Sequence, residues 1–208
     1  MFEAVFEVQG VLMDFDLPPV TDKNQLMPKP AWAKQSVKIC GLGSQVFDSA
    51  ICGLRTLESK IASLYKVGAV QEWSPSAIGE WPSLDFATRY VTPHAFAKGQ
   101  HAVPFAKDVD PQGVLLKTTS PVGIHLEDNH VLYYEAHHIE YNKVVYQPVD
   151  PAVIRIGQIV QLQVAFTSVP LWGKKGQHQL ACKLRSLVIL DRNVEEVCLF
   201  ISMPFFLA

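Results

Sequence analysis

The sequence predicts one mainly β domain, an antiparallel barrel or sandwich that carries a single amphipathic helix and a long irregular loop. Apolar and polar residues alternate near the N-terminus and again through the second half of the chain, which is typical of half-buried strands. One segment between them repeats apolar residues every three or four positions, as an amphipathic helix does. Because all-β domains often reach 208 residues, we assign residues 1–208 to a single domain.

The charge balance limits the partners. The formal net charge is −2 and only 18% of the residues are charged, so the chain lacks the basic excess that accompanies strong binding to phosphate backbones. A nucleic-acid partner would therefore need a local basic patch.

The N-terminal segment and the apolar runs indicate the compartment. Glu3 and Glu7 stand where a secretory signal needs a basic start and an apolar stretch. The longest nearly uncharged run, residues 156–172, is shorter than the roughly 20 apolar residues that span a bilayer. We expect no membrane span and an intracellular protein, cytoplasmic or nuclear.

The first strand is predicted over residues 2–17, where Phe2, Ala4, Phe6 and Val8 alternate with polar residues. The alternation changes phase after Gly10, which predicts a bulge or a tight bend there. Residues 18–35 contain four prolines, three lysines and Trp32, a composition that predicts an extended surface connection. A short strand is predicted over residues 37–42.

The helix is predicted between Asp48 and Val67, where apolar residues recur at spacings of three and four. Asp48 would be the N-cap, and Gly68 would end the helix. Residues 71–111 follow with many prolines and aromatic side chains and with no sustained period. We predict about forty residues of irregular structure that fold over the sheet and provide a binding surface.

The remaining residues predict a β-meander. Its strands are expected over residues 113–117, 131–138, 144–147, 159–169, 179–190 and 197–203. The fourth and fifth of these are long, apolar on one side, and joined by PLWGKKGQH, whose two glycines suit a hairpin loop.

Four strings of the sequence are similar to a known family. LYKVGAVQEWSPS, EWPSLDFATRYVTPHA, IRIGQIVQLQVAFTSVP and LRSLVILD resemble a large family of uncharacterised proteins from mushroom-forming fungi, and the resemblance covers most of the chain. It implies an intracellular fungal origin and carries no activity, cofactor or catalytic residue.

A second resemblance concerns the fold alone. In OB-type barrels a glycine-containing turn introduces a long strand, which a hairpin then joins to another long strand. The segment Ile156-Gly157-Gln158-Ile159-Val160 is similar to such a turn. An OB-like barrel is thus one form of the predicted fold.

One candidate site is a basic and aromatic hairpin. Its residues are Arg155, Trp172, Lys174, Lys175, Lys183 and Arg185. On a barrel such a surface would follow phosphates while the indole stacks on a base, a contact worth about 1–3 kcal/mol. The alternative is a solvated hairpin tip with Trp172 packed onto the sheet.

A second candidate site is rich in histidine. Imidazole and carboxylate ligands from neighbouring strands would hold zinc or a redox metal, and Glu135 and His137 would share one face of a strand. The alternative is a polar hairpin tip and a strand end exposed to water. The candidate ligands are His125, His130, Glu135, His137 and His138.

The leading hypothesis is a non-enzymatic binding module that recognises a partner through the Trp172 hairpin or the aromatic loop, with single-stranded nucleic acid as the first ligand to test. One alternative is a metal-dependent enzyme that uses the histidine-rich segment. Another is a structural or assembly protein that forms a homo-oligomer through its apolar residues 200–208. No nucleotide-binding glycine motif and no Gly-x-Ser-x-Gly elbow occurs, and the sequence identifies no cofactor.

Overall fold

The computed structural model describes residues 3–139, 143–171, 173–174 and 176–192. The described chain is mainly β, as predicted, and its centre is an eight-stranded sheet in the order β3-β4-β2-β1-β9-β10-β7-β8. The strands are β1 (Val5–Asp16), β2 (Lys34–Cys40), β3 (Ser76–Ile78), β4 (Trp81–Arg89), β7 (Leu132–Ile139), β8 (Lys143–Pro148), β9 (Ile159–Pro170) and β10 (His178–Asp191).

The smaller elements lie in the connections. Two strands form a separate ladder, β5 (Thr92–Pro93) and β6 (Gly123–Ile124). The helices are α1 (Gln45–Ala62), α2 (Val114–Thr119), and the 3₁₀ helices η1 (Lys23–Leu26), η2 (Pro30–Trp32), η3 (His94–Phe96), η4 (Glu127–Asn129) and η6 (Pro151–Val153). No helix of the described chain is long and apolar enough to cross a membrane.

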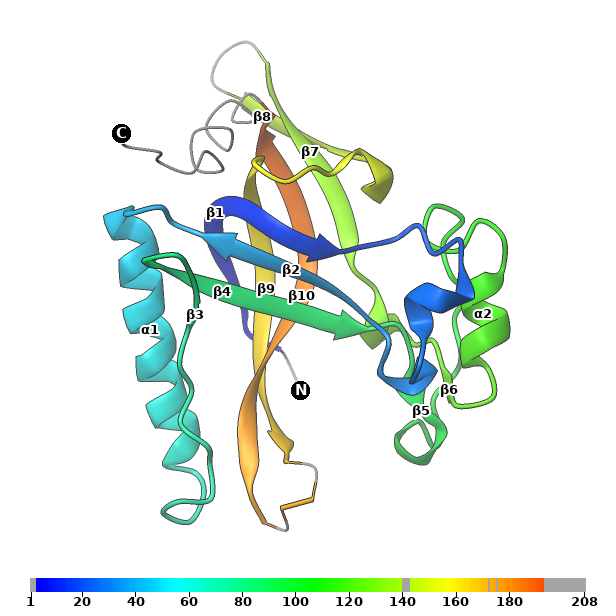
Figure 1. The fold of residues 1–208 in the computed structure, drawn as a ribbon, viewed down its shortest axis with the longest axis horizontal. Helices are drawn as coiled ribbons and strands as arrows, with labels where there is room; N and C mark the ends of the chain where they lie inside the picture. The colour runs from blue at the N-terminus through cyan, green and yellow to red at the C-terminus, as the bar shows by residue number, and fades with distance from the viewer. Residues whose placement is uncertain (1–2, 140–142, 172, 175, 193–208) are drawn as a thin grey trace, which may run out of the picture.

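The sheet is open but strongly curled. β1 pairs with β9 over residues 5–11 and with β2 over residues 11–16, so it links two layers that cross each other in Figure 1. The curl brings β4 close to β10, where the Thr88 hydroxyl donates a hydrogen bond of 2.6 Å to the Leu184 carbonyl. The sheet does not close into a barrel, because β3 and β8 remain as its edge strands.

The main core lies between these two layers. Residues of β1, β2 and β4 pack there against residues of β9 and β10, and the apolar contacts supply the stability of the fold. Its fully buried members include Leu12, Ile39, Leu162, Leu184 and Leu187.

The N-terminal strand is continuous, and its irregularity lies elsewhere than predicted. β1 passes through Gly10 without a break, and the register shift falls between Leu12 and Asp14. Gly10 lies at a tightly packed position instead, since a Cβ there would lie 3.1 Å from the Cys40 carbonyl oxygen and 3.2 Å from the Phe47 ring.

The predicted helix exists but begins earlier. α1 runs from Gln45 to Ala62, so it begins three residues before and ends five residues before the predicted bounds, and Gly68 is not its stop. Ser44 occupies the N-cap position assigned to Asp48. Asp48 lies in the first turn, where a carboxylate is favourable beside the positive end of the helix dipole. The helix lies beside the sheet (Figure 1) and buries Phe47, Ile51 and Leu54.

The predicted strand over residues 113–117 is wrong, because this segment begins helix α2. The Asp110 carboxylate accepts hydrogen bonds from the backbone N–H groups of Leu115 and Leu116, at 3.0 and 2.9 Å. These amides would otherwise lack partners at the start of a helix, so Asp110 stabilises a helix where the apolar pattern alone suggested a strand.

The prediction of irregular structure over residues 71–111 is also wrong in part. β4 lies inside this range and pairs with β2 over residues 83–89 and with β3 over residues 81–83. Leu84, Phe86 and Thr88 are buried and alternate with Asp85 and Ala87, but the alternation is short and follows a proline.

The second half contains the predicted strands in an unexpected order. β7, β8, β9 and β10 match four predicted strands to within about one residue. They do not form a meander, because β7 pairs with β10 in parallel and β8 lies at the edge. The predicted strand over residues 197–203 and the proposed oligomer contact over residues 200–208 lie outside the described residues.

Candidate nucleic-acid interface

The predicted basic hairpin joins β9 and β10. Lys174 lies in its turn and is exposed. Trp172 and Lys175 lie outside the described residues. The structure therefore confirms the hairpin itself and describes one of the three residues assigned to its tip.

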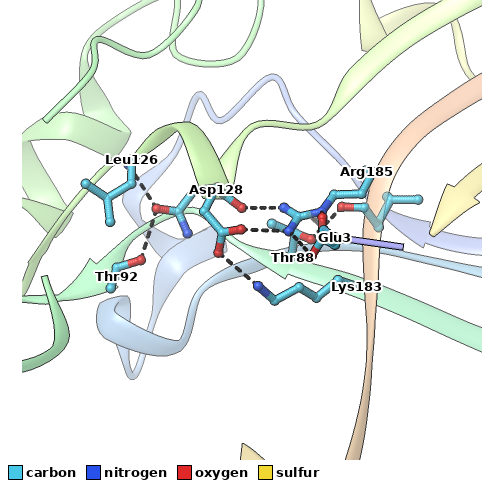
Figure 2. Close-up of polar contacts among 9 residues, drawn as sticks. Glu3, Thr88, Thr92, Leu126, Asp128, Lys183 and Arg185 are labelled. Atoms are coloured by element: carbon cyan, nitrogen blue, oxygen red, sulfur yellow. Dashed lines mark hydrogen bonds and ion pairs between the residues drawn. The ribbon is translucent and has the colours of Figure 1, made fainter. Parts of the chain in front are cut away.

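Lys183 and Arg185, on β10, are engaged with carboxylates. The Lys183 ammonium lies 2.9 Å from Asp128 Oδ2, and the Arg185 guanidinium donates to both oxygens of Glu3 and to Asp128. Figure 2 shows Asp128 directed at both cations, with Glu3 also beside Arg185. A phosphate could reach these cations only by displacing the carboxylates.

The network changes the pKa of Asp128. Burial raises the pKa of Asp128, but the hydrogen bonds and the positive charges of Lys183 and Arg185 together outweigh burial and hold this pKa below its ordinary value. Asp128 is thus ionised through the neutral range and compensates the β10 cations.

Arg155 is bound within its own turn. Its Nη1 donates hydrogen bonds to the carbonyl oxygens of Ala152 and Ile154, at 2.6 and 2.7 Å. Arg155 therefore closes the end of η6, and no contact joins it to Lys183 or Arg185 among the described residues.

The histidine-rich segment separates into two places. His125 and His130 lie together, with ring centroids 4.7 Å apart. Glu135 and His137 form another pair at 3.8 Å, in which Glu135 is also bound by Arg192, and His138 is exposed. Within the residues that the structure covers, no three histidine, cysteine or acidic side chains are grouped so as to hold a metal ion.

A groove of about 330 Å³ lies along β1, β2 and β4. Polar and charged residues of the three strands line it together with a few apolar ones. The lining residues are Asp14, Phe15, Asp16, Lys34, Ser36, Val37, Lys38, Asp85, Phe86, Ala87 and Cys182.

The charges of the groove are mixed. Lys38 pairs with Asp85 at 3.5 Å, and the Ser76 hydroxyl also binds Asp85. Burial raises the pKa of Asp16, Lys34 opposes this shift, and the neighbouring carboxylate of Asp14 adds to it. The groove thus contains cations together with carboxylates that weaken its attraction for anions.

An aromatic and cationic cluster lies at the end of β4 that adjoins the groove. The Arg89 guanidinium stacks over the Trp32 ring, 4.1 Å from its centroid, and Trp32 is 47% exposed. Lys34 is the direct partner of Arg89 across β2 and β4, so both side chains emerge from one face of the sheet. We call Trp32, Lys34 and Arg89 the Trp32 cluster.

Among the described residues, Arg89 is a cation without a compensating carboxylate. Burial lowers its pKa, and in the described part of the chain no carboxylate lies within ion-pair distance of its guanidinium. In this respect Arg89 differs from Arg185 and Arg192, each of which is bound by a carboxylate.

Sequence analysis missed the Trp32 cluster for an identifiable reason. Trp32 and Lys34 belong to a segment that was predicted to be a surface connection, and Arg89 belongs to the segment predicted to be irregular. The local signal was the indole between Lys29 and Lys34, but only the pairing of β2 with β4 adds Arg89 to it.

Comparison with known proteins adds one distant similarity. No protein-family model matches the chain, and no curated protein matches it. The crystal structure of gp2.5, a single-stranded DNA binding protein encoded by bacteriophage T7, is similar over 92% of this chain and 93% of that chain, with 12% identity and a TM-score of 0.47. At this distance the similarity carries no argument about function.

Proposed function

We propose that this chain is a binding module for single-stranded nucleic acid and that the Trp32 cluster and the adjoining groove form its contact surface. The observation that carries the proposal is the stack of Arg89 on the exposed Trp32 ring, with no carboxylate of the described chain to neutralise the guanidinium.

The chemistry of the cluster suits a single strand. A base can stack on the exposed indole face, a contact worth about 1–3 kcal/mol and available to any base. The cations Arg89 and Lys34 would contact phosphates, which contribute most of the affinity of non-specific binding. An Arg held over a ring is also less mobile, so it loses less freedom when it binds.

The position in the sheet supports the same reading. OB-type barrels bind oligonucleotides over the face of their second and third strands. Here the groove and the Trp32 cluster lie on β2 and β4, which are the second and third long strands of the chain. This is a fold-level analogy and stands beside the argument from the residues.

The proposal leaves Lys183 and Arg185 out of the contact surface. Both cations already bind Asp128, so a phosphate would have to compete with a carboxylate of the same chain. They have a structural role in the proposal, which is to fix η4 against β10.

The test is a titration of a fluorescently labelled single-stranded oligonucleotide followed by anisotropy. Trp32→Ala and Arg89→Ala should each weaken binding by about 5- to 150-fold, since 1–3 kcal/mol corresponds to that range. Arg55→Ala is the matched control, because Arg55 is an exposed cation on α1. Equal affinity of the wild type and both variants would contradict the proposal.

A further inference from the structure

A second cavity, of about 270 Å³, lies between β7, β8 and η4. It shares no lining residue with the groove. Its polar lining consists of Gln35, Asp108, His125, Asn129, His130 and two tyrosines, Tyr133 and Tyr134. Several of these side chains have hydrogen-bonding groups that the described chain leaves unused.

His125 presents a fixed acceptor. Its Nδ1 lies 2.7 Å from the Tyr90 carbonyl oxygen, so Nδ1 carries the proton and Nε2 has a lone pair. Burial lowers the pKa of His125, which keeps the ring neutral. The ring is held by stacking on Phe105, with centroids 4.1 Å apart.

His130 contributes a buried nitrogen that has no partner. Its Nδ1 side faces Glu127 at 3.7 Å, and its Nε2 is buried without a hydrogen bond to any described residue. A buried nitrogen without a hydrogen bond lowers the stability of the fold. An unpaired buried nitrogen beside a cavity indicates a place where a ligand supplies the missing hydrogen bond.

The other polar side chains of the lining are bonded mainly to one another, and Asn129 contributes a donor. The Tyr133 hydroxyl donates to Gln35 Oε1 at 2.5 Å, and Gln35 Nε2 donates to the Asn129 carbonyl oxygen at 3.2 Å. The side-chain oxygen of Asn129 accepts from Thr92 and from the Leu126 N–H. This fixes the amide and leaves its NH₂ group without a bond to any described residue.

We infer that this cavity binds one planar ring that carries both hydrogen-bond donors and acceptors, and that the ring is a nucleobase. The cavity is below the range of about 300–1,000 Å³ typical of drug-sized ligands, so it suits a single small ring system. Proteins hold a base that has left its stack through hydrogen bonds to the donors and acceptors on its edge and through contacts with aromatic side chains. The choice of a nucleobase rests on the proposed function.

The experiment uses free nucleosides, because they lack the phosphates that the Trp32 cluster would bind. The full chain is labelled with ¹⁵N and titrated with adenosine, guanosine, cytidine and uridine. His130→Phe retains a ring and removes both nitrogens, and His138→Phe is the matched control at an exposed histidine. Trp32→Ala tests whether the two surfaces are separate, because a free base could also stack on the exposed indole.

At least one nucleoside should shift the ring signals of His125 and His130 and raise the melting temperature. His130→Phe should weaken this binding at least tenfold, while His138→Phe and Trp32→Ala should leave it unchanged. Without ligand, His130→Phe should melt higher than the wild type, because it removes an unpaired buried nitrogen.

Two results would overturn the inference. The first is that no nucleoside binds, and the second is that His130→Phe binds nucleosides as the wild type does. If the oligonucleotide still requires Trp32 and Arg89, either result leaves the proposed function in place. If the wild type binds a nucleoside but no oligonucleotide, the proposed function is contradicted and the nucleoside site is not.

Discussion

Arg185 Nη2 lies 2.6 Å from Asp128 Oδ1, although the two residues are on β10 and η4 and far apart in the sequence. The same guanidinium also holds Glu3. Because its side chain is only 15% exposed, the pairs are partly shielded from water and screened less than surface pairs. This network therefore stabilises the fold and removes the β10 cations from the candidate interface.

Asp128→Asn should lower the free energy of unfolding by about 0.5–1 kcal/mol at pH 7, the range for partly exposed pairs. The pKa of Asp128 is held below its ordinary value in the folded protein. Its stabilisation is therefore present above the unfolded-state pKa and is lost as the pH falls through the folded-state pKa. Urea titrations at pH 7 and near pH 3 measure the difference.

The neighbour Glu127 supplies the control for this prediction. Its side chain is 83% exposed, so Glu127→Gln should change the stability little at either pH. An Asp128→Asn effect that is equally large at both pH values would show that ionic pairing is not its cause.

Asp110→Ala should destabilise the chain by about 1 kcal/mol, because it removes the acceptor for two amides at the start of α2. Asp110→Asn keeps an acceptor oxygen and should cost less. The measurement is the midpoint of urea unfolding. Equal stability of Asp110→Ala and the wild type would contradict the assigned capping role.

Local periodicity predicted those strands and the helix whose apolar faces are regular. The strands β7 to β10 match their predicted ranges closely, and α1 is present but displaced toward the N-terminus from its predicted range. β4 was missed because Ser83 and Leu84 are both buried although they are adjacent, which removes the period of two at its start. The parallel pairing of β7 with β10 depends on contacts between distant segments, so no local pattern encodes it.

A double-mutant cycle tests the buried pair of Tyr133 and Gln35. Tyr133→Phe alone leaves the Gln35 oxygen without its donor, which should cost about 1–3 kcal/mol. The double variant Tyr133→Phe/Gln35→Leu should lose less stability than the sum of the losses in the two single variants, because both partners are then apolar. Strict additivity in urea unfolding would show that the two side chains are not coupled.

Asp16→Asn should tighten oligonucleotide binding about two- to fivefold, since it removes a negative charge from the groove beside Lys34. The wild-type affinity should also rise as the pH falls, because the pKa of Asp16 is raised and its carboxyl becomes neutral earlier than usual. Anisotropy titrations at pH 7.5 and 5.0 compare the two proteins. The affinity of Asp16→Asn for the oligonucleotide should depend less on pH than that of the wild type.

The same carboxyl has a predictable effect on stability. A raised folded-state pKa means that protonated Asp16 favours the fold, and this contribution is lost as the pH rises through that pKa. Asp16→Asn should therefore unfold at slightly higher urea than the wild type at pH 7. The advantage should vanish in acid; a larger advantage at pH 3 would contradict the assigned shift.

The candidate interface was less predictable than the fold. The basic hairpin was identified from residues that are near one another in the chain, but its counter-charges lie 55 positions away at Asp128 and 182 positions away at Glu3. The Trp32 cluster joins a residue of β4 to a tryptophan before β2. A cation that is paired with a carboxylate and one that has no carboxylate partner in the described chain look alike in sequence and differ only in the folded structure.

The salt dependence of oligonucleotide binding tests the central proposal most directly. If Lys34 and Arg89 contact phosphates, the plot of log Kobs against log salt for the double variant Lys34→Ala/Arg89→Ala should be shallower than that of the wild type, by roughly 0.7 per lost contact. Lys183→Ala should keep the wild-type slope, because Lys183 is bound by Asp128. An unchanged slope in the double variant, with a shallower slope in Lys183→Ala, would contradict the proposal. It would indicate that the phosphates contact the cations of β10 instead.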